Sequence, residues 1–390
     1  MNFDYDHPDT SLRFGRGRRN EIGEITSEYG DTAAVVTTRT AMQEAGFLDD
    51  VEESLDEAGV EYLVYNYVQP NPTVENVENG IRELWDNDVD VVVAMGGGSV
   101  MDTAKTMALG LASLDSPDES IWGYCTGEEE IEEALPIVAV PTTSGTGSHI
   151  DPWAVISNEE ADAKPGFGGD PLIPKAAVVD PDIPGEMPPK LTARTGFDAL
   201  CHLNEAYVAE GASGMSDVFA EKGIEKVGDY LRDAVDDDTE AREEMAVADT
   251  LAGICETTSM VIVTHALAHS VSALHPDVAH GDALAALTSE VARFNVENGD
   301  KETKKRYSKI AELLGVEIAD PVLDAIYVVD AFEELKKDIG LNVTLEDLGV
   351  EEDEIEELAD NSEEYMEMAI ETNPVELDHD DLVEILEESY

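Results

Sequence analysis

The sequence is poor in positive charge. It has 23 Lys and Arg against 88 Asp and Glu, which gives a formal net charge of −65 at pH 7 over 390 residues. Nucleic acids and anionic membrane surfaces are bound by basic faces, so this balance excludes the first as a partner and argues against the second. Because the acidic residues are spread along the chain between apolar runs such as residues 90–98, we expect a folded protein, not a disordered acidic one.

So dense a negative charge also indicates where the protein works. Carboxylates repel one another in dilute buffer and weaken a fold, whereas concentrated salt screens the repulsion. The composition therefore predicts a halophilic protein from a salt-rich cytoplasm.

Cysteine and long apolar runs are scarce as well. The three cysteines, Cys125, Cys201 and Cys255, are odd in number and show no CxxC spacing, so a disulfide framework is not expected. No run of about 18 apolar residues is present, and no apolar stretch follows the arginine pair Arg18 and Arg19. We therefore expect a cytoplasmic protein without a membrane span.

The length and the patterning predict two domains. In the first half, apolar runs alternate with amphipathic helical segments, which is typical of a parallel sheet with helices on both faces. The expected strands lie within residues 32–38, 61–68, 88–99, 135–145 and 176–189. After a proline-rich segment, the apolar residues recur with the 3.6-residue period that is typical of helices. We therefore expect an α/β domain over residues 1–186 and an all-α domain over residues 187–390.

Two glycine-containing turns follow expected strands. Residues 94–105 (AMGGGSVMDTAK) bring a buried strand into three glycines, and we expect a helix to begin at Ser99. Glycine lets the backbone approach a pyrophosphate, and a helix N-terminus offers free N–H groups. The spacing matches neither GxGxxG nor a P-loop, so alone it fits a structural turn equally well. The second turn, residues 141–148 (PTTSGTGS), follows a neighbouring strand, and the two together favour a dinucleotide.

Histidine is infrequent, yet half of the eight histidines fall within 16 residues, at His265, His269, His275 and His280. Asp198 and His202 form an i, i+4 pair earlier in the chain, which places both side chains on one helix face. A carboxylate and several imidazoles suit a divalent first-row metal. Taken singly, each residue has a structural alternative, such as a helix cap for Asp198. His275 precedes a proline and is more simply a loop residue.

Taken in order, the motifs GGGSVMDTAK, PTTSGTGS, TGFDALCH and HALAH…HG resemble those of the iron-containing, group III alcohol dehydrogenase family. The resemblance runs over essentially the whole chain, and the acidity is that of a haloarchaeal-type member. It implies a dehydroquinate synthase-like architecture, with a dinucleotide-binding α/β domain, a helical domain and a metal in the cleft between them. It also implies a homodimer or a larger homo-oligomer.

The resemblance assigns site residues by position. It implies four metal ligands: Asp198, His202, His265 and His280. It implies that His269 lies beside the metal and the nicotinamide, where an imidazole could carry the proton. The matching cofactor positions are Asn71, Gly97, Gly98, Ser99, Asp102, Thr142, Thr143, Thr146 and Lys164. The implied metal is Fe(II), or Zn(II) in some members, and mixed Asp and His ligands suit both.

The implied activity is that of a metal-dependent, NAD(P)-linked alcohol dehydrogenase. The metal would lower the pKa of the hydroxyl of a small alcohol, so that an alkoxide forms near neutral pH, and hydride would pass to the nicotinamide. In the reverse direction an aldehyde would be reduced.

The chain departs from the family pattern in two places. Thr38 stands where the family often has an aspartate that binds the adenosine ribose, and Arg39 follows it. A threonine does not repel a 2′-phosphate and an arginine can bind one, so we expect NADP, or dual use with NAD, unless Arg39 only points to solvent. His149 stands where glutamate is usual and Trp153 where a polar residue is common. Both positions are near the cleft, where they either alter substrate preference or only pack.

Other activities fit less well. A dehydroquinate synthase-like lyase or cyclase acts on a phosphorylated, carboxylated sugar and needs basic side chains, but no Lys or Arg occurs between Arg242 and Arg293. Glycerol dehydrogenase has a different ligand pattern, and maleylacetate reductase lacks the metal. A non-catalytic, metal-stabilised protein would be expected to lose the histidine at position 269.

Overall fold

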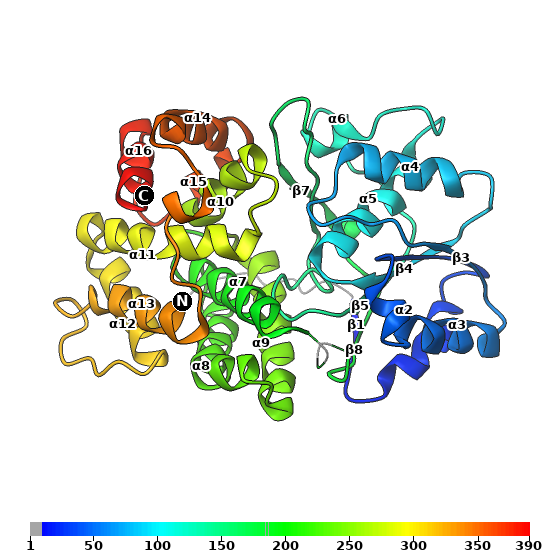
Figure 1. Cartoon of the computed structure of the whole chain (residues 1–390), viewed down its shortest axis with the longest axis horizontal. Helices are drawn as coiled ribbons and strands as arrows, with labels where there is room; N and C mark the ends of the chain where they lie inside the picture. Colours follow the sequence, from blue (N-terminus) through cyan, green and yellow to red (C-terminus); the bar gives the residue numbers. More distant parts are fainter. Residues whose placement is uncertain (1–9, 184, 186) are drawn as a thin grey trace.

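The computed structural model describes residues 10–183, 185 and 187–390. A six-stranded parallel sheet occupies the first half of the chain, at the right of Figure 1, in the order β1-β8-β5-β4-β2-β3. The strands are β1 (Ser11–Phe14), β2 (Thr32–Thr37), β3 (Glu61–Tyr65), β4 (Val91–Gly96), β5 (Ile137–Pro141) and β8 (Ala176–Val179). The second strand expected from the sequence ends earlier than residue 68, because the chain leaves the sheet after Tyr65.

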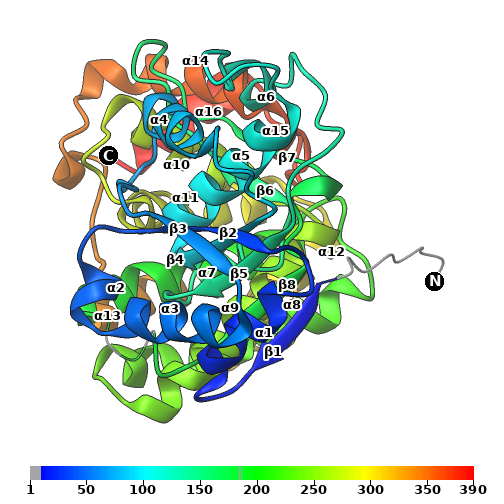
Figure 2. The ribbon, with the colours of Figure 1, turned by 90° about the vertical axis from the view of Figure 1, so that its right-hand side faces the viewer.

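Helices cover both faces of this sheet (Figure 2). They are α1 (Ile22–Thr26), α2 (Ala41–Glu44), α3 (Phe47–Ala58), α4 (Val74–Leu84), α5 (Gly98–Ser113) and α6 (Trp122–Cys125), with short 3₁₀ turns η1 (Arg18–Glu21) and η2 (Asp170–Leu172). Strand β4 is buried throughout, and its alternate residues enter two cores. Val92 and Ala94 pack with α4 and α5, and Val93 packs with α1 and α3. Burial on both faces explains why these strands read as continuous apolar runs.

The second half is helical and has one core, at the left of Figure 1. Its helices are α7 (Pro189–Val208), α8 (Ser216–Val235), α9 (Thr239–Thr258), α10 (Val263–Leu274), α11 (His280–Asn298), α12 (Lys301–Leu313), α13 (Tyr327–Ile339), α14 (Ile355–Tyr365), α15 (Glu367–Glu371) and α16 (His379–Glu388), with η4 (Glu346–Leu348) and η5 (Glu352–Glu354). A small antiparallel pair, β6 (Trp153–Val155) and β7 (Gly166–Gly168), belongs to the first half.

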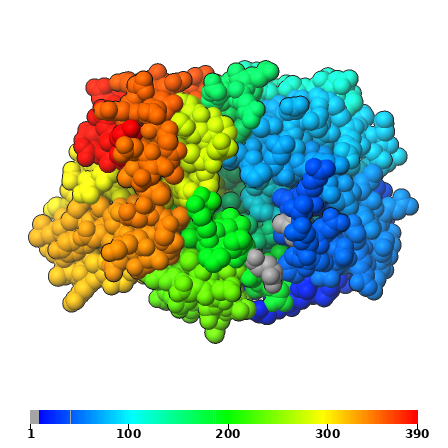
Figure 3. All heavy atoms as spheres, viewed as in Figure 1, coloured from blue at the N-terminus to red at the C-terminus, as the bar shows by residue number. Residues whose placement is uncertain are grey.

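The predicted fold class, a parallel α/β domain followed by a helical one, is confirmed. The last strand ends at Val179 and α7 begins at Pro189. The predicted boundary at residue 186 lies outside the described residues and stays a prediction. On the face drawn in Figure 3, the surface is hollowed where the two halves meet.

No single helix in the described part of the chain is long and apolar enough to cross a membrane. There, only α9 and α10 taken together have the length and composition of a span, and they are bent by 103° at the break between them.

Candidate active site

The two glycine-containing turns pack directly against each other. Gly96 at the end of β4 pairs with Pro141 at the end of β5, and the N–H of Thr142 donates to the carbonyl of Gly96 at 3.0 Å. A Cβ atom at Gly97 would lie 2.9 Å from Thr143 Oγ1, and one at Gly98 would lie 2.7 Å from Thr146 Cγ2. Only glycine allows this approach, so the packing explains the glycines and brings together four of the predicted cofactor positions.

Helix α5 begins at Gly98, one residue before the predicted start, and no side chain caps its N-terminus. Uncapped N–H groups at a helix N-terminus form an anion-binding site. Ser99 lies in this first turn, and Asp102 follows one turn later. Burial raises the pKa of Asp102 to about 7, against the opposing charges of Lys105 and Lys164.

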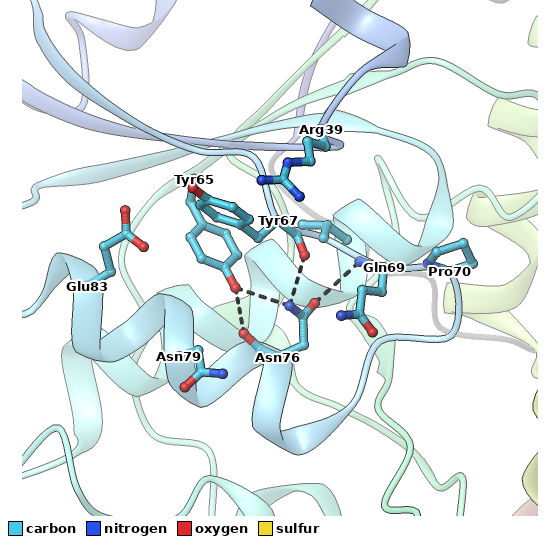
Figure 4. A pocket seen from close by; sticks show the side chains of 9 residues that line it. Arg39, Tyr65, Tyr67, Gln69, Pro70, Asn76, Asn79 and Glu83 are labelled. Carbon is cyan, nitrogen blue, oxygen red and sulfur yellow. Dashed lines mark hydrogen bonds between the residues drawn. The ribbon is translucent and has the colours of Figure 1, made fainter.

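Thr38 and Arg39 follow β2, the strand next to β4. From β2 the chain builds outward to β3 and then crosses back to β4, so a topological switch point lies between β2 and β4, where open α/β sheets bind ligands. The exposed Arg39 lies over the ring of Tyr67, with its guanidinium carbon 5.2 Å from the ring centroid. Both residues line a pocket of about 470 Å³ together with Tyr65, Asn76, Glu83 and their neighbours (Figure 4). Arg39 therefore does more than point to solvent.

Asn71 and Lys164 connect the two halves of the molecule. Lys164 Nζ donates to Asn71 Oδ1 at 3.1 Å, and Asn71 Nδ2 donates to the carbonyl of Pro276 at 2.8 Å. Asn71 adopts φ 50, a left-handed conformation that asparagine tolerates. Burial lowers the pKa of Lys164 to about 8.

His269 adjoins the same connection. Its Nδ1 lies 3.1 Å from the carbonyl of Lys164, so Nδ1 carries the proton and Nε2 is left as an acceptor. Burial, and then the charge of Lys164, lowers the pKa of His269 well below the ordinary value. The ring centroid of His269 is 5.4 Å from that of His280. A neutral imidazole with a free nitrogen thus lies beside the predicted metal ligands.

Three of the predicted metal ligands lie around a carboxylate oxygen of the fourth, Asp198. Helix α7 carries Asp198 and His202, α10 carries His265, and α11 begins at His280. Asp198 Oδ1 lies 3.8 Å from His202 Nδ1, 3.8 Å from His265 Nε2 and 3.7 Å from His280 Nε2.

The cluster that these four residues form has the properties of a metal site. Within the described part of the chain, Asp198 Oδ1, His265 Nε2 and His280 Nδ1 are buried and have no hydrogen-bond partner. An unsatisfied buried polar group costs about 1–3 kcal/mol, so a concentration of them beside stacked imidazoles needs a compensating ligand. The rings of His202 and His265 stack with centroids 4.5 Å apart. One oxygen and three imidazole donors fit Fe(II) or Zn(II).

Glu205 supports this cluster and was not predicted. It is fully buried, accepts from His265 Nδ1 at 2.8 Å, and accepts from the N–H of Ile262 at 2.8 Å. The bond leaves His265 Nε2 free to face Asp198, the usual arrangement behind a metal-binding imidazole. Burial lowers the pKa of His265, but the carboxylates of Glu205 and Asp198 outweigh it and raise that pKa to about 10. The sequence did contain a signal for Glu205, because this residue follows Asp198 by seven positions and therefore lies on the same face of α7.

Asp249 on α9 fastens the second turn to the helical half and was also not predicted. Its Oδ1 accepts from the N–H groups of Gly145 and Gly147 at 2.8 and 2.7 Å. His202 Nδ1 donates to the carbonyl of Gly145 at 3.3 Å, so the turn that packs on Gly97 and Gly98 also contacts the ligand cluster. Nothing in the sequence marks Asp249 among 88 acidic residues.

His149 lies in the packing between the halves. Its Nε2 hydrogen-bonds with Thr250 Oγ1 at 3.0 Å, and burial followed by the charge of Lys105 lowers its pKa to about 3. Lys105 is fully buried and donates to Ser148 Oγ, Asp151 Oδ1 and the carbonyl of Trp153, at 2.8, 2.8 and 2.7 Å. These bonds fix the segment that leads to β6.

His275 lies apart from the cluster. Its Nε2 is 3.0 Å from Glu354 Oε2, which gives it a structural partner near η5.

Glu256 on α9 is a third residue that was not predicted. Its Oε2 is 3.7 Å from His202 Nε2, and its side chain is 13% exposed. Burial, and then the Asp151 carboxylate, raises the pKa of Glu256 well above the ordinary value.

The chain is similar to known proteins over nearly its whole length. The family model described as iron-containing alcohol dehydrogenase matches residues 9–181, and the C-terminal model of the same family matches residues 192–390. The chain is 34% identical over 355 residues to a choline dehydrogenase of Bacillus subtilis, covering 90% of this chain and 86% of that one. It is 31% identical to an NADPH-dependent butanol dehydrogenase of Clostridium saccharobutylicum, with 96% and 95% covered.

A solved structure gives a similar result. The archaeal halo-thermophilic alcohol dehydrogenase ADH/D1 of a Red Sea brine pool is 41% identical, superposes with a TM-score of 0.96, and is matched over 100% of this chain and 99% of that one. The protein is an oxidoreductase that acts on alcohols with iron and NAD(P), and the chain belongs to the iron-containing alcohol dehydrogenase family.

Proposed function

We propose that Asp198, His202, His265 and His280 hold the iron of this dehydrogenase, and that the two glycine turns hold NAD(P) beside it. The observation that carries the proposal is the approach of His265 Nε2 and His280 Nε2, at 3.8 and 3.7 Å, to Asp198 Oδ1, a buried oxygen without a hydrogen-bond partner among the described residues. The ring of His202 stacks on that of His265 in the same cluster. We also propose residue 186 as the boundary between the domain that binds NAD(P) and the helical domain that carries the four metal ligands. We further propose a homodimer or larger assembly in the cytoplasm, to be tested by light scattering in concentrated salt.

Each residue has a definite task in oxidation of the alcohol. Iron(II), or zinc(II) in its place, supplies a Lewis acid that lowers the pKa of the substrate hydroxyl. Glu205 holds the Nδ1–H of His265, and the backbone at Gly97, Gly98 and Ser99 binds the pyrophosphate. Asn71 and Lys164 hold the nucleotide on the side of His269. His269 Nε2 would accept the proton that leaves the hydroxyl, and NAD(P), when bound, would supply the acceptor for the hydride.

The ligand assignment is tested by measuring bound metal. We expect D198N and H280A to lose most of their iron by elemental analysis after dialysis against a weak chelator, and H275A to retain it as the matched control. Wild-type protein reloaded with Fe(II) or Zn(II) should reduce the cofactor with primary alcohols in multimolar salt, and metal-free protein should not. Full metal content in D198N would overturn the assignment.

We propose NADP(H) as the preferred cofactor. Thr38 brings no negative charge to the end of β2, and Arg39 lies over Tyr67 at the edge of a pocket large enough for an aromatic base and its phosphate. A guanidinium binds a phosphate through paired charge-assisted hydrogen bonds. R39A should therefore raise the KM for NADP by about tenfold and change the KM for NAD by less than about twofold. An equal effect on both nucleotides would count against this role.

The alcohol is proposed only as a class. The relatives named above act, by their names, on choline and on butanol, so we propose a small primary alcohol, neutral or cationic, and its aldehyde as the reaction partners.

A further inference from the structure

His280 is the least enclosed of the four predicted metal ligands. Its side chain is 25% exposed, against 7%, 6% and 3% for His202, Asp198 and His265. Asp198 and His202 lie well inside α7, whereas His280 is the first residue of α11, and no side chain caps the N-terminus of that helix. Helix ends fray more readily than helix interiors. The place of this imidazole therefore depends on how the first turn of α11 is held.

An ion pair from α7 holds that turn. Arg194 Nε donates to Asp282 Oδ1 at 2.8 Å, and Arg194 Nη2 donates to Asp282 Oδ2. Asp282 lies two residues after His280, and its N–H donates to the carbonyl of Ala279 at 2.9 Å, within the first turn of the helix. Arg194 lies one turn before Asp198, on the same face of α7. A paired contact between a guanidinium and a carboxylate is charge-assisted and fixes direction as well as distance.

The backbones of the two helices meet at the same place. A Cβ atom at Gly281 would lie 2.5 Å from the carbonyl oxygen of Arg194, so only glycine allows α11 to approach α7 this closely. Gly281 stands between His280 and Asp282 in the chain. The ion pair thus acts across a close contact of two helices. Because the side chains of Arg194 and Asp282 are only 26% and 11% exposed, water and salt screen this pair less than a surface pair.

We propose that Arg194 and Asp282 form a clamp that sets the position of His280 at the iron. The inference rests on the proposed function, in which His280 is one of the metal ligands. Arg194 and Asp282 are positioning residues, because they act through the backbone of α11 and do not bind the metal themselves. The clamp joins the helix that carries two of the ligands to the helix that carries the last one. Without it, the first turn of α11 is released and His280 binds the metal weakly, while the other three ligands remain in place.

Cobalt(II) is the probe for this clamp, because its visible absorption depends on the number and arrangement of its ligands. We expect R194A and D282N to bind Co(II) about tenfold less tightly than the wild type in competition with a chelator, and their absorption bands should shift toward those of H280A. R194K should recover little of the affinity, because an ammonium group cannot make the paired contact. R293A, which removes the ion pair of Arg293 with Glu290 from the same helix, is the matched control and should bind Co(II) as the wild type does.

The double variant R194A/D282N should bind Co(II) about as tightly as either single variant, because both changes remove one contact. Circular dichroism in concentrated salt establishes that each variant is folded, and D282N and R194K carry the test if R194A does not fold. Wild-type Co(II) affinity and spectrum in the folded variants would overturn the inference. So would weaker binding of NADP to R194A with an unchanged cobalt spectrum, since that result would assign Arg194 to the nucleotide. Failure of the proposed function would be distinct, because H280A itself would then keep the wild-type affinity and spectrum.

Discussion

A single hydrogen bond, from His265 Nδ1 to Glu205, determines which nitrogen of that histidine is free. Glu205 is fully buried and is also held by the N–H of Ile262, so its position is fixed before any metal arrives. The carboxylate holds the imidazole ring at the orientation in which Nε2 faces Asp198. Residues of this kind behind a metal ligand contribute to affinity through preorganisation.

We therefore expect E205Q to weaken iron or zinc binding by about 10- to 100-fold, because a neutral amide no longer holds the Nδ1 proton as strongly. Competition with a chelator of known affinity measures this directly. E210Q, an exposed change near the end of the same helix, should leave the affinity unchanged. Equal metal affinity in E205Q and wild type would show that Glu205 only fills space.

Asp249 makes a pH-dependent contribution to stability. Burial raises its pKa to about 7, against two backbone N–H donors that lower it. A raised carboxyl pKa means that the folded state holds the proton more tightly than the unfolded state, whose value is near 3.9. The contribution to stability is therefore complete below about pH 4 and is lost as the pH rises to about 7.

D249N keeps an acceptor for Gly145 and Gly147 but does not titrate. The free energy of unfolding of the wild type, relative to D249N, should therefore fall between about pH 4 and pH 7 in metal-free protein and stay level above that range. Urea denaturation at a series of pH values gives the difference, in which the other acidic groups largely cancel. A difference that is constant with pH would contradict the raised pKa.

At the scale of elements, the second turn is held on three sides. It packs on the start of α5 at Gly97 and Gly98, on α7 through Gly145, and on α9 through Asp249. A shift of this turn therefore moves the nucleotide side and the metal side together. The turn couples the two halves more directly than any surface ion pair, because exposed pairs contribute little.

The close contact between Gly98 and Thr146 can be tested by a substitution that obstructs it and a second substitution that relieves the obstruction. G98A places a Cβ 2.7 Å from Thr146 Cγ2, so the turns must separate. We expect nucleotide affinity to fall by about tenfold or more, with metal content retained, because overpacking costs about 1–3 kcal/mol. In the double variant G98A/T146S the obstructing methyl group is absent, and affinity measured by fluorescence titration should recover. Failure to recover would mean that Gly98 matters through backbone freedom and not through this contact.

At the scale of the whole molecule, the net charge of −65 dominates. Many of the few basic residues form ion pairs, such as Arg16 with Glu243, which links the two halves. Most carboxylates are left without a basic partner, and their mutual repulsion favours expanded states. Salt shortens the range of that repulsion from about 10 Å at 0.1 M to about 3 Å at 1 M.

The urea midpoint should therefore rise steadily as KCl increases from dilute to multimolar concentration. Sucrose at matched osmolality is the control, because it alters hydration without screening charge and should raise the midpoint less. If both additives raised it equally, charge repulsion would not be the main cause of the salt requirement.

Much of the molecule followed from local sequence. Apolar runs separated by helical periods determined the parallel sheet, since burial on both faces requires such runs. The i, i+4 spacing of Asp198 and His202 determined that they share a helix face. The glycines after β4 predicted a turn at the end of that strand, but only the structure showed which side chains pack against it.

Other features were decided by tertiary structure alone. Glu205 and Asp249 are two acidic residues among 88, and each acquired its role by burial against a segment far away in the chain. Likewise, only the structure shows that Arg39 lies over the ring of Tyr67 and that His149 hydrogen-bonds with Thr250 where the two halves pack together. Periodicity determines which side of an element is apolar, but which sides meet depends on how the two halves pack together. The charge and hydrogen-bonding of a buried group are set at that contact.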